Sequence, residues 1–237
     1  MSDDEDRPGA PEFESRRADA RKVIDAIDGA FAHEGPQRHN WFEEVYSRAD
    51  GDAAGVPWAD MKAKPQLIDW LAKNPGGGRT AIDIACGLGD NAEALGQAGY
   101  QTTAFDYAAG AVEWASERFA GGNVDYQVAD LFNLPAAWHG AFDLVHECYT
   151  IQAMRGELRD KAFAAIAGLV SPGGRLLMIT RTRPDESEPK GPPWPLSPLE
   201  IKKFEALGLR RESLTAYETR RGDRAIPHVM AEFLRAD

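Results

Sequence analysis

The chain has 237 residues, of which 43% are hydrophobic, and a formal net charge of -11. This length is enough for one sizeable core, and the negative charge disfavours nucleic acid and anionic lipid as partners. No apolar run approaches the roughly 18 residues of a membrane span and no basic, apolar start resembles a signal peptide, so we expect a cytoplasmic protein with no membrane partner. The oligomeric state stays open.

The first 78 residues are predicted to form a tail and a helical cap. Residues 1–14 are dominated by Asp, Glu, Pro and Gly, a composition typical of a disordered acidic tail. From residue 15 to 32 apolar residues recur at helical spacing, and further helices are expected around Trp41 to Tyr46 and over Pro65 to Leu71. The interpretation is a single domain over 15–237, with a helical cap at 15–78 and a core at 79–237.

The core alternates short β-rich runs with helical ones, which favours a doubly wound, Rossmann-like parallel sheet. Helices are expected to start near Asp90, Ala108 and Gly156, and another over Ser197 to Leu207. Two more strands joined by a turn at 220–223 are expected within 210–234, so the sheet is mostly parallel with an antiparallel C-terminal strand. The five parallel strands are predicted near Thr80–Ala85, Gln101–Phe105, Val124–Val128, Phe142–Glu147 and Gly174–Thr180.

The first strand of this sheet runs into a glycine turn that opens a helix. Gly87, Gly89 and Ala92 satisfy the dinucleotide pattern G-x-G-x-x-G/A, so a nicotinamide or flavin fold has to be weighed. A dinucleotide places its pyrophosphate at the helix N-terminus, where Asp90 and the nearby Asp83 put like charges. A cationic, phosphate-free cofactor tolerates these acids better.

The segment AIDIACGLGDNA resembles the first signature of class I S-adenosylmethionine-dependent methyltransferases, D-x-G-x-G-x-G, with Ala85 in place of the first glycine. Asp106 ends the second strand, where a carboxylate can accept hydrogen bonds from both ribose hydroxyls of the cofactor. Asp130 ends the third strand, where the resemblance implies a contact with the adenine amino group. S-adenosyl-L-methionine is therefore the expected cofactor. The residues expected to bind it are Trp41, Trp58, Asp83, Ala85, Cys86, Gly87, Gly89, Asp106, Tyr107, Asp130, Leu131 and Glu147.

A weaker resemblance links the chain to thiol, halide and thiopurine methyltransferases. It rests on Trp41 and Tyr46, on the Pro57–Trp58 pair, and on the G-P-P-W run that ends at Trp194. In that group the region ahead of the sheet closes over cofactor and acceptor, so the cap is expected to act as a lid. Packing of Trp41 and Trp58 against the sheet, and a rigid loop without a ligand at Trp194, are the plain alternatives.

The expected reaction is methyl transfer to a small-molecule nucleophile, with a thiol as the preferred acceptor and an oxygen or nitrogen acceptor as the alternative. A thiol ionises near neutral pH, whereas an alcohol needs a base. Candidate catalytic residues are His146, Glu147 and Tyr149, and candidate acceptor-binding residues are Tyr149, Arg181 and Trp194.

Two other functions stay open: a nicotinamide-dependent oxidoreductase and a protein that binds S-adenosylmethionine without catalysis. A metal site is not expected, because Cys86 and Cys148 have no Cys or His neighbours at metal-ligand spacing.

Overall fold

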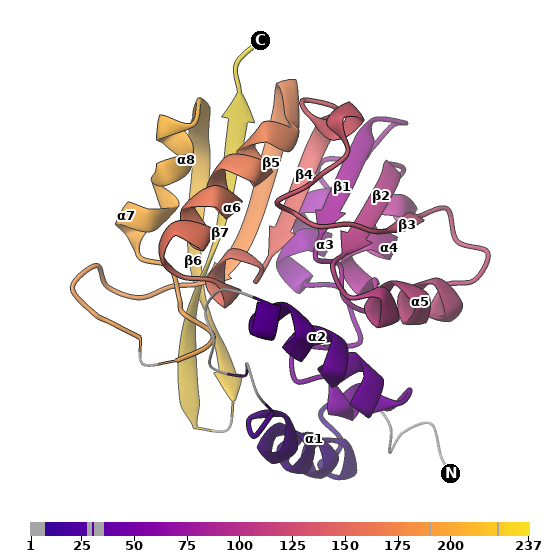
Figure 1. Cartoon of the computed structure of the whole chain (residues 1–237). Coiled ribbons are helices and arrows are strands. Elements are labelled where there is room, and N and C mark those ends of the chain that lie inside the picture. The colour runs from indigo at the N-terminus through magenta and orange to yellow at the C-terminus, as the bar shows by residue number, and fades with distance from the viewer. Residues whose placement is uncertain (1–7, 28–29, 31–35, 190, 222) are drawn as a thin grey trace.

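The computed structural model describes residues 8–27, 30, 36–189, 191–221 and 223–237. Within these residues the chain forms one seven-stranded sheet with helices on both faces and a helical layer along one edge (Figure 1). The strands are β1 Thr80–Ile84, β2 Gln101–Asp106, β3 Asp125–Val128, β4 Phe142–Cys148, β5 Val170–Arg181, β6 Leu209–Arg221 and β7 Arg224–Arg235. The helices are α1 Pro11–Ile24, α2 Pro36–Ala49, α3 Pro65–Leu71, α4 Asp90–Gln97, α5 Ala109–Arg118, α6 Gly156–Leu169, α7 Pro198–Ile201 and α8 Lys203–Ala206.

The sheet has the strand order β3-β2-β1-β4-β5-β7-β6. The pairs β1–β2, β1–β4, β2–β3 and β4–β5 are parallel, whereas β7 runs antiparallel to both β5 and β6. The prediction of a mostly parallel, Rossmann-like sheet with an antiparallel C-terminal strand is confirmed. The direction of winding reverses between β1 and β4, so a ligand is expected beyond the carboxyl ends of these strands.

Two apolar clusters hold the helices against the sheet. On one face α3 and α4 cover Ala81, Leu144 and Leu177, and on the other α6, α7 and α8 cover Ile82, Val145 and other strand residues. Successive strand residues point to opposite faces, so each buried parallel strand has apolar residues on both sides. This burial, at roughly 25 cal/mol per Å² of apolar surface, is the main stabilising term of the core.

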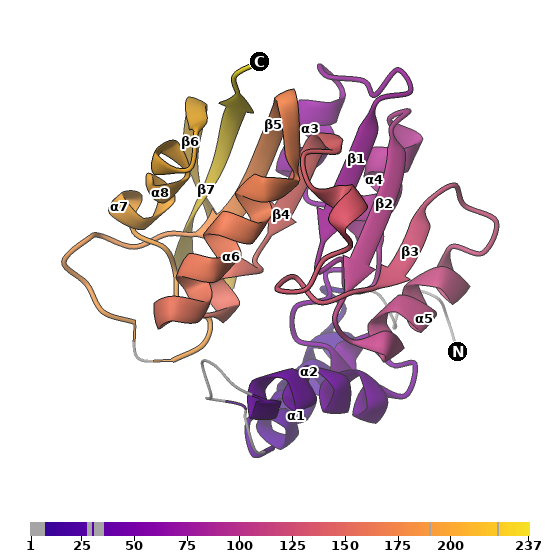
Figure 2. The same cartoon turned by 45° about the horizontal axis from the view of Figure 1, so that its top comes forward.

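Helices α1 and α2 lie beyond the edge of the sheet at which the parallel strands end, and both views show them beneath that edge (Figures 1 and 2). The Glu43 carboxylate of α2 accepts a 2.7 Å hydrogen bond from the Ala109 N–H at the start of α5. Arg17 of α1 donates to the Ala59 carbonyl oxygen of the loop that leads to α3. The cap is therefore tied both to the core and to its own connecting loop.

The first helix differs from its prediction. It was expected over 15–32, but α1 spans Pro11–Ile24, and residues 28, 29, 31 and 32 lie outside the described residues, as do residues 1–7 of the expected tail. The helix begins early because Pro11 favours the first helical position and Phe13, only 1% exposed, gives the first turn an apolar anchor. The expected helix over Ser197 to Leu207 is two short helices, α7 and α8.

We predict that Phe13→Ala lowers the free energy of unfolding by about 3 kcal/mol, because a buried aromatic side chain leaves a cavity. The guanidinium of Arg17, 4.6 Å from the ring centroid, also loses its cation–π partner. Urea unfolding of the variant and of Glu12→Ala, an exposed neighbour, measures this. If both variants lose the same small amount, the first turn of α1 does not contribute to the stability of the fold.

Candidate functional site

The turn between β1 and α4 has a backbone conformation that favours glycine. Ala85, Gly87 and Gly89 have φ angles of +51°, +54° and +85°. A Cβ atom at Gly89 would lie 2.5 Å from the Tyr126 hydroxyl oxygen, and one at Gly87 would lie 3.3 Å from that of Tyr46. Ala85, which stands where the methyltransferase signature has its first glycine, thus adopts a conformation that costs a residue with a side chain about 1 kcal/mol.

Asp106, the last residue of β2, holds this turn from the neighbouring strand. Its carboxylate accepts 3.0 Å hydrogen bonds from the N–H groups of Gly87 and Ala108. The side chain is 8% exposed, and burial raises the pKa of Asp106 to about 6 against the opposing effect of these N–H donors. A carboxylate has about four lone-pair positions, so two backbone donors leave room for further donors from a ligand.

Asp83 of β1 and His146 of β4 form a buried pair that the separate sequence motifs did not reveal. The register places the two residues opposite each other, and the His146 Nδ1 atom lies 2.6 Å from the Asp83 Oδ1 atom. The second carboxylate oxygen of Asp83 and the Nε2 atom of His146 are buried without a hydrogen-bond partner in the described structure. Such atoms are costly in a folded protein unless a ligand or water satisfies them.

Glu147 follows His146 on β4, and its side chain lies on the opposite face of the sheet from the Asp83–His146 pair. Its Oε1 atom accepts hydrogen bonds from the N–H groups of Thr150 at 2.7 Å and Ile151 at 2.9 Å, and its Oε2 atom is buried without a partner among the described residues. Burial raises the pKa of Glu147 to about 7. Near the carboxyl ends of β1 and β4, two carboxyl oxygens and one imidazole nitrogen therefore lack hydrogen-bond partners among the described residues.

The other expected cofactor residues surround the same edge. Asp130 follows β3, and its Oδ1 atom accepts a 2.9 Å hydrogen bond from the Phe132 N–H. Leu131 is buried in the apolar cluster that α6 covers, whereas Tyr107 is 41% exposed. The half-buried thiol of Cys86 sits within the glycine turn. The structure thus gathers the predicted positions at adjacent strand ends.

The two cap tryptophans pack against each other, with ring centroids 5.6 Å apart, but their indole N–H groups bond to different partners. Trp41 packs with Ile24, Ala30 and Val45, and its indole N–H donates to the Ile24 carbonyl oxygen at 2.9 Å. Trp58 donates its indole N–H to the Tyr46 hydroxyl at 2.9 Å, the group that approaches Gly87. Trp58 is therefore linked to the glycine turn through the side chain of Tyr46, whereas the Trp41 N–H group links α2 to α1.

Two of the three expected acceptor residues, Tyr149 and Arg181, lie at the next strand ends, and the third, Trp194, does not. Tyr149 follows β4 with a φ angle of +68°, and the guanidinium of Arg181, at the end of β5, lies 6.0 Å from its ring centroid. Trp194 is buried in the loop before α7, where its backbone contacts Gln152 and Arg159. Tyr149 and Arg181 are brought together, and Trp194 packs at the start of α6.

Sequence reasoning missed Lys64, Tyr217 and His228, which the fold brings to Tyr149 from three distant segments. The Nζ atom of Lys64 lies 4.4 Å from the Tyr149 ring centroid, and the ring of His228 lies 5.6 Å from that of Tyr149. One signal was available: on β7, His228 alternates with Val229, Ala231 and Phe233, which are buried on the opposite face. Nothing local to the sequence pairs β7 with β5.

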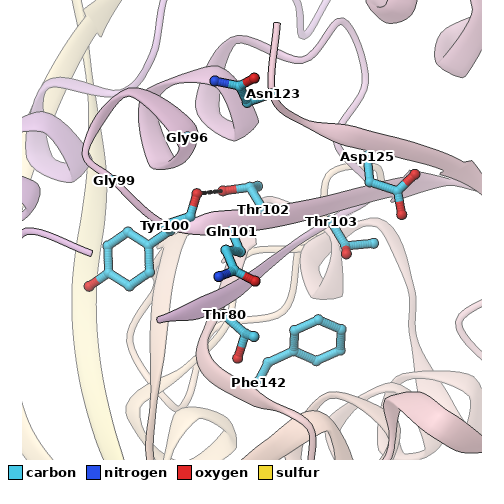
Figure 3. Close-up of a pocket in the computed structure, with 10 residues that line it drawn as sticks. All are labelled: Thr80, Gly96, Gly99, Tyr100, Gln101, Thr102, Thr103, Asn123, Asp125 and Phe142. Carbon is cyan, nitrogen blue, oxygen red and sulfur yellow. Dashed lines mark hydrogen bonds between the residues drawn. The ribbon is translucent and has the colours of Figure 1, made fainter. Parts of the chain in front are cut away.

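A separate hollow of about 480 Å³ lies at the opposite edge of the sheet, and Figure 3 shows it lined by the amino ends of β1 and β2. Its polar wall includes Thr80, Thr103 and Asp125, and no buried side chain with an unpartnered polar atom points to a ligand there. In the described residues no group of three His, Cys, Asp or Glu side chains is arranged to hold a metal ion. No helix of that part of the chain is long and apolar enough to cross a bilayer.

Comparison with known proteins shows which family the sequence of the sheet core resembles. Residues 81–174 match the family model described as a methyltransferase domain. This segment of the chain is similar in sequence to methyltransferase domains. The resemblance to class I S-adenosylmethionine-dependent methyltransferases is thereby confirmed for the sheet core, and the predicted activity and cofactor agree with it.

The chain is similar to individual proteins over only part of its length. The chain is 34% identical over 63% of its length to a ubiquinone/menaquinone biosynthesis C-methyltransferase UbiE from Desulfotalea psychrophila, of which it covers 60%. It is 32% identical over 50% of its length to a ubiquinone biosynthesis O-methyltransferase from Thiobacillus denitrificans, of which it covers 52%. The N-methyltransferase NodS from Bradyrhizobium japonicum, solved with S-adenosyl-L-homocysteine, shares the fold with a TM-score of 0.64, 15% identity and coverage of 82% of this chain and 98% of NodS. The chain thus spans between half and two thirds of the curated relatives named here.

We predict that Glu147→Gln changes the pH dependence of stability. The folded-state pKa of about 7 lies above the usual 4.5, so the native state binds the proton more tightly and wild-type stability falls as pH rises from about 4.5 to 7. Glutamine does not ionise. The stability of the variant relative to wild type should therefore rise by up to about 3 kcal/mol across that window.

Urea unfolding at pH 4.5, 6 and 8 measures this difference, with Glu157→Gln, an exposed acid of α6, as the matched control. The control should show the same stability difference from wild type at every pH. A Glu147→Gln curve parallel to wild type would show that the Glu147 carboxyl is not held at a raised pKa.

Proposed function

We propose that the protein transfers a methyl group from S-adenosylmethionine to a small-molecule nucleophile. The observation that carries this proposal is the joint position of the glycine turn and Asp106, two adjacent strand ends linked by the Gly87–Asp106 hydrogen bond. A turn with positive φ angles lets the backbone approach a ligand closely, and the acid beside it accepts hydrogen bonds from two ribose hydroxyls. The similarity of residues 81–174 to methyltransferase domains supports the same conclusion.

The unpartnered buried atoms fit the charge of this cofactor. S-adenosylmethionine carries an ammonium and a sulfonium cation, and the free oxygens of Asp83 and Glu147 lie at the ends of β1 and β4. Asp130 and Leu131 at the end of β3 are assigned to the adenine, next to the ribose acid of β2. An anionic pyrophosphate would meet Asp83 instead, although Asp90 is neutralised by Arg118 at 2.9 Å and argues less against phosphate than its sequence position suggests.

When bound, the cofactor supplies an electrophilic methyl group on a positively charged sulfur. The protein then has to align the acceptor with that methyl group and keep water away. Asp83 and Glu147, from opposite faces of the sheet, are assigned to attracting the ammonium group, and Asp106 is assigned to the ribose, so that the cofactor is held at both ends. The aromatic layer of Trp58 and Tyr46 above the glycine turn is assigned to excluding water.

We favour an oxygen acceptor over the thiol that the weaker family resemblance suggested. Support comes from the relatives, whose names give C- and O-methylation, and from the side chains beyond β4, which include a base and cations suited to a hydroxyl acid. A thiol stays as the alternative, together with a protein that binds the cofactor without transfer. Methyl transfer from labelled cofactor to phenols, carboxylates and thiols distinguishes these alternatives.

We predict that Asp106→Asn weakens S-adenosylmethionine binding by roughly 10- to 100-fold. Asparagine has nearly the same shape but lacks the charge, and a hydrogen bond to a charged group contributes about 1.5 to 3 kcal/mol. Titration calorimetry gives the affinity, and a melting curve shows whether the variant is folded. Asp125→Asn, an exposed acid at the opposite edge of the sheet, is the matched control and should bind as wild type does.

Equal affinity in folded Asp106→Asn and wild type would remove Asp106 from the ribose site. A preference for a nicotinamide cofactor over S-adenosylmethionine in the wild-type protein would contradict the proposed function as a whole.

We further predict that Trp58→Phe weakens cofactor binding several-fold. Phenylalanine retains the ring contacts with Trp41, Phe42 and Tyr46 but loses the N–H group that positions the Tyr46 hydroxyl over Gly87. Trp41→Phe is the control, since the Trp41 N–H bonds to Ile24 and its loss should reduce melting temperature without changing affinity. Both quantities are measured on both variants. If Trp58→Phe behaves as Trp41→Phe does, Trp58 packs the cap and is no part of a lid.

A further inference from the structure

Five side chains from five segments meet beyond the carboxyl ends of β4 and β5, and we call them the His228 cluster: Lys64, Tyr149, Arg181, Tyr217 and His228. The register pairs Arg181 of β5 with His228 of β7, and His228 with Tyr217 of β6. Tyr149 and Tyr217 pack against the face of the sheet that α3 covers, and Lys64 is the residue before α3. The cluster therefore lies one strand beyond the expected cofactor site, at the same edge.

The rings of the cluster form a wall. His228 stacks on Tyr217 with ring centroids 5.2 Å apart and an interplanar angle of 20°, and Tyr149 lies 5.6 Å from His228 on a tilted plane. The Tyr217 hydroxyl is buried without a hydrogen-bond partner in the described structure. A buried hydroxyl of this kind is expected to bond to a ligand or to water.

The protonation of His228 follows from its contacts. Its Nδ1 atom lies 2.8 Å from the Ile226 carbonyl oxygen, which only accepts, so the proton of the neutral ring is on Nδ1. Burial lowers the pKa of His228, and the charges of Arg181 and Lys64 act in the same direction while Asp60 opposes them. The ring is thus neutral near pH 7, and its Nε2 atom has a lone pair that can accept a proton.

Two cationic side chains lie close to these rings. Lys64 and Arg181 both approach the Tyr149 ring, while two acids, Asp60, which pairs with the Lys64 ammonium, and Glu147, also act on Tyr149. Tyr149 itself has a φ angle of +68°, unusual for a bulky residue and typical of ligand sites, where surrounding contacts enforce such a conformation. An aromatic wall with a guanidinium beside it suits an aromatic anion, because the rings stack on the aromatic part and a guanidinium can bind a carboxylate at two points.

We propose that the His228 cluster is the acceptor site and takes a hydroxylated aromatic acid, with Arg181 binding the carboxylate and the His228 Nε2 atom accepting the proton of the hydroxyl group that is methylated. This inference rests on the function proposed above. The hydroxyl proton moves to Nε2, an oxygen electron pair forms the bond to the methyl carbon, and the carbon–sulfur bond breaks with its electrons remaining on sulfur. The products are a methyl ether and S-adenosylhomocysteine, and the imidazolium returns its proton to water.

Binding is tested first, with 3,4-dihydroxybenzoate titrated into the 237-residue chain saturated with S-adenosylhomocysteine. Wild type should bind this anion at least tenfold more tightly than neutral catechol, and Arg181→Gln should remove the difference. Arg210→Gln, whose side chain is 72% exposed near the other end of β6, should retain it. Tyr217→Phe, which keeps the ring stack, should weaken binding of both compounds.

The proton transfer is tested by the pH profile of kcat for labelled methyl transfer to the same acid. In wild type kcat should fall below the pH at which His228 gains a proton. His228→Asn keeps an N–H donor for the Ile226 carbonyl but lacks Nε2, so its rate should be low at pH 7 and recover about tenfold per pH unit as the hydroxyl ionises by itself. His139→Asn, an exposed histidine of the loop before β4, should keep the wild-type profile.

The outcomes separate this inference from the proposed function. If the protein binds S-adenosylhomocysteine but none of a series of hydroxybenzoates and hydroxycinnamates, the acceptor proposal is wrong and the cofactor proposal stands. An unchanged pH profile in folded His228→Asn overturns the role of His228. Failure of wild type to bind either S-adenosylmethionine or its product overturns the proposed function itself.

Discussion

The hydrogen bond from the Gly87 N–H to the Asp106 carboxylate is the contact on which the rest of the site depends. It joins the turn after β1 to the end of β2, and the second oxygen of Asp106 fixes the Ala108 N–H just before α5. Two helix starts and two strand ends are thereby held in one geometry. The cost is a buried carboxyl group whose pKa is raised to about 6, which the two N–H donors only partly offset.

Local sequence patterns predicted most of the core because each signal lies within a few residues of the structure it determines. β1, β2 and β4 were predicted within one residue of their bounds, and the glycine turn was found from Gly87 and Gly89. Two errors have tertiary causes. α1 begins at Pro11 because Phe13 is buried against the rest of the cap, and β5 begins at Val170 because that residue pairs with Phe142 across a register shift.

The site was predictable only where it lies on single strand ends. Asp83 and Asp106 lie near the ends of recognisable strands and Asp130 follows another, so their proximity follows from a parallel sheet. The Asp83–His146 pair depends on the register between β1 and β4, which no local pattern specifies. His228 and Tyr217 depend on β7 inserting between β5 and β6, a strand order that places a residue close to the C-terminus beside Lys64.

Acidic and basic side chains lie at different strand ends along this edge of the sheet. Buried acids lie at β1, β2 and β4, whereas Lys64, Arg181 and the neutral His228 lie toward β5 and β7. A reaction between a sulfonium cation and an oxygen anion loses charge as its transition state forms, so a water-poor site favours it more than bulk water does. Water would instead stabilise the separated ions. In the proposed reaction, carboxylates attract the cation, cationic side chains attract the anion, and a cap that excludes water would favour the step that cancels their charges.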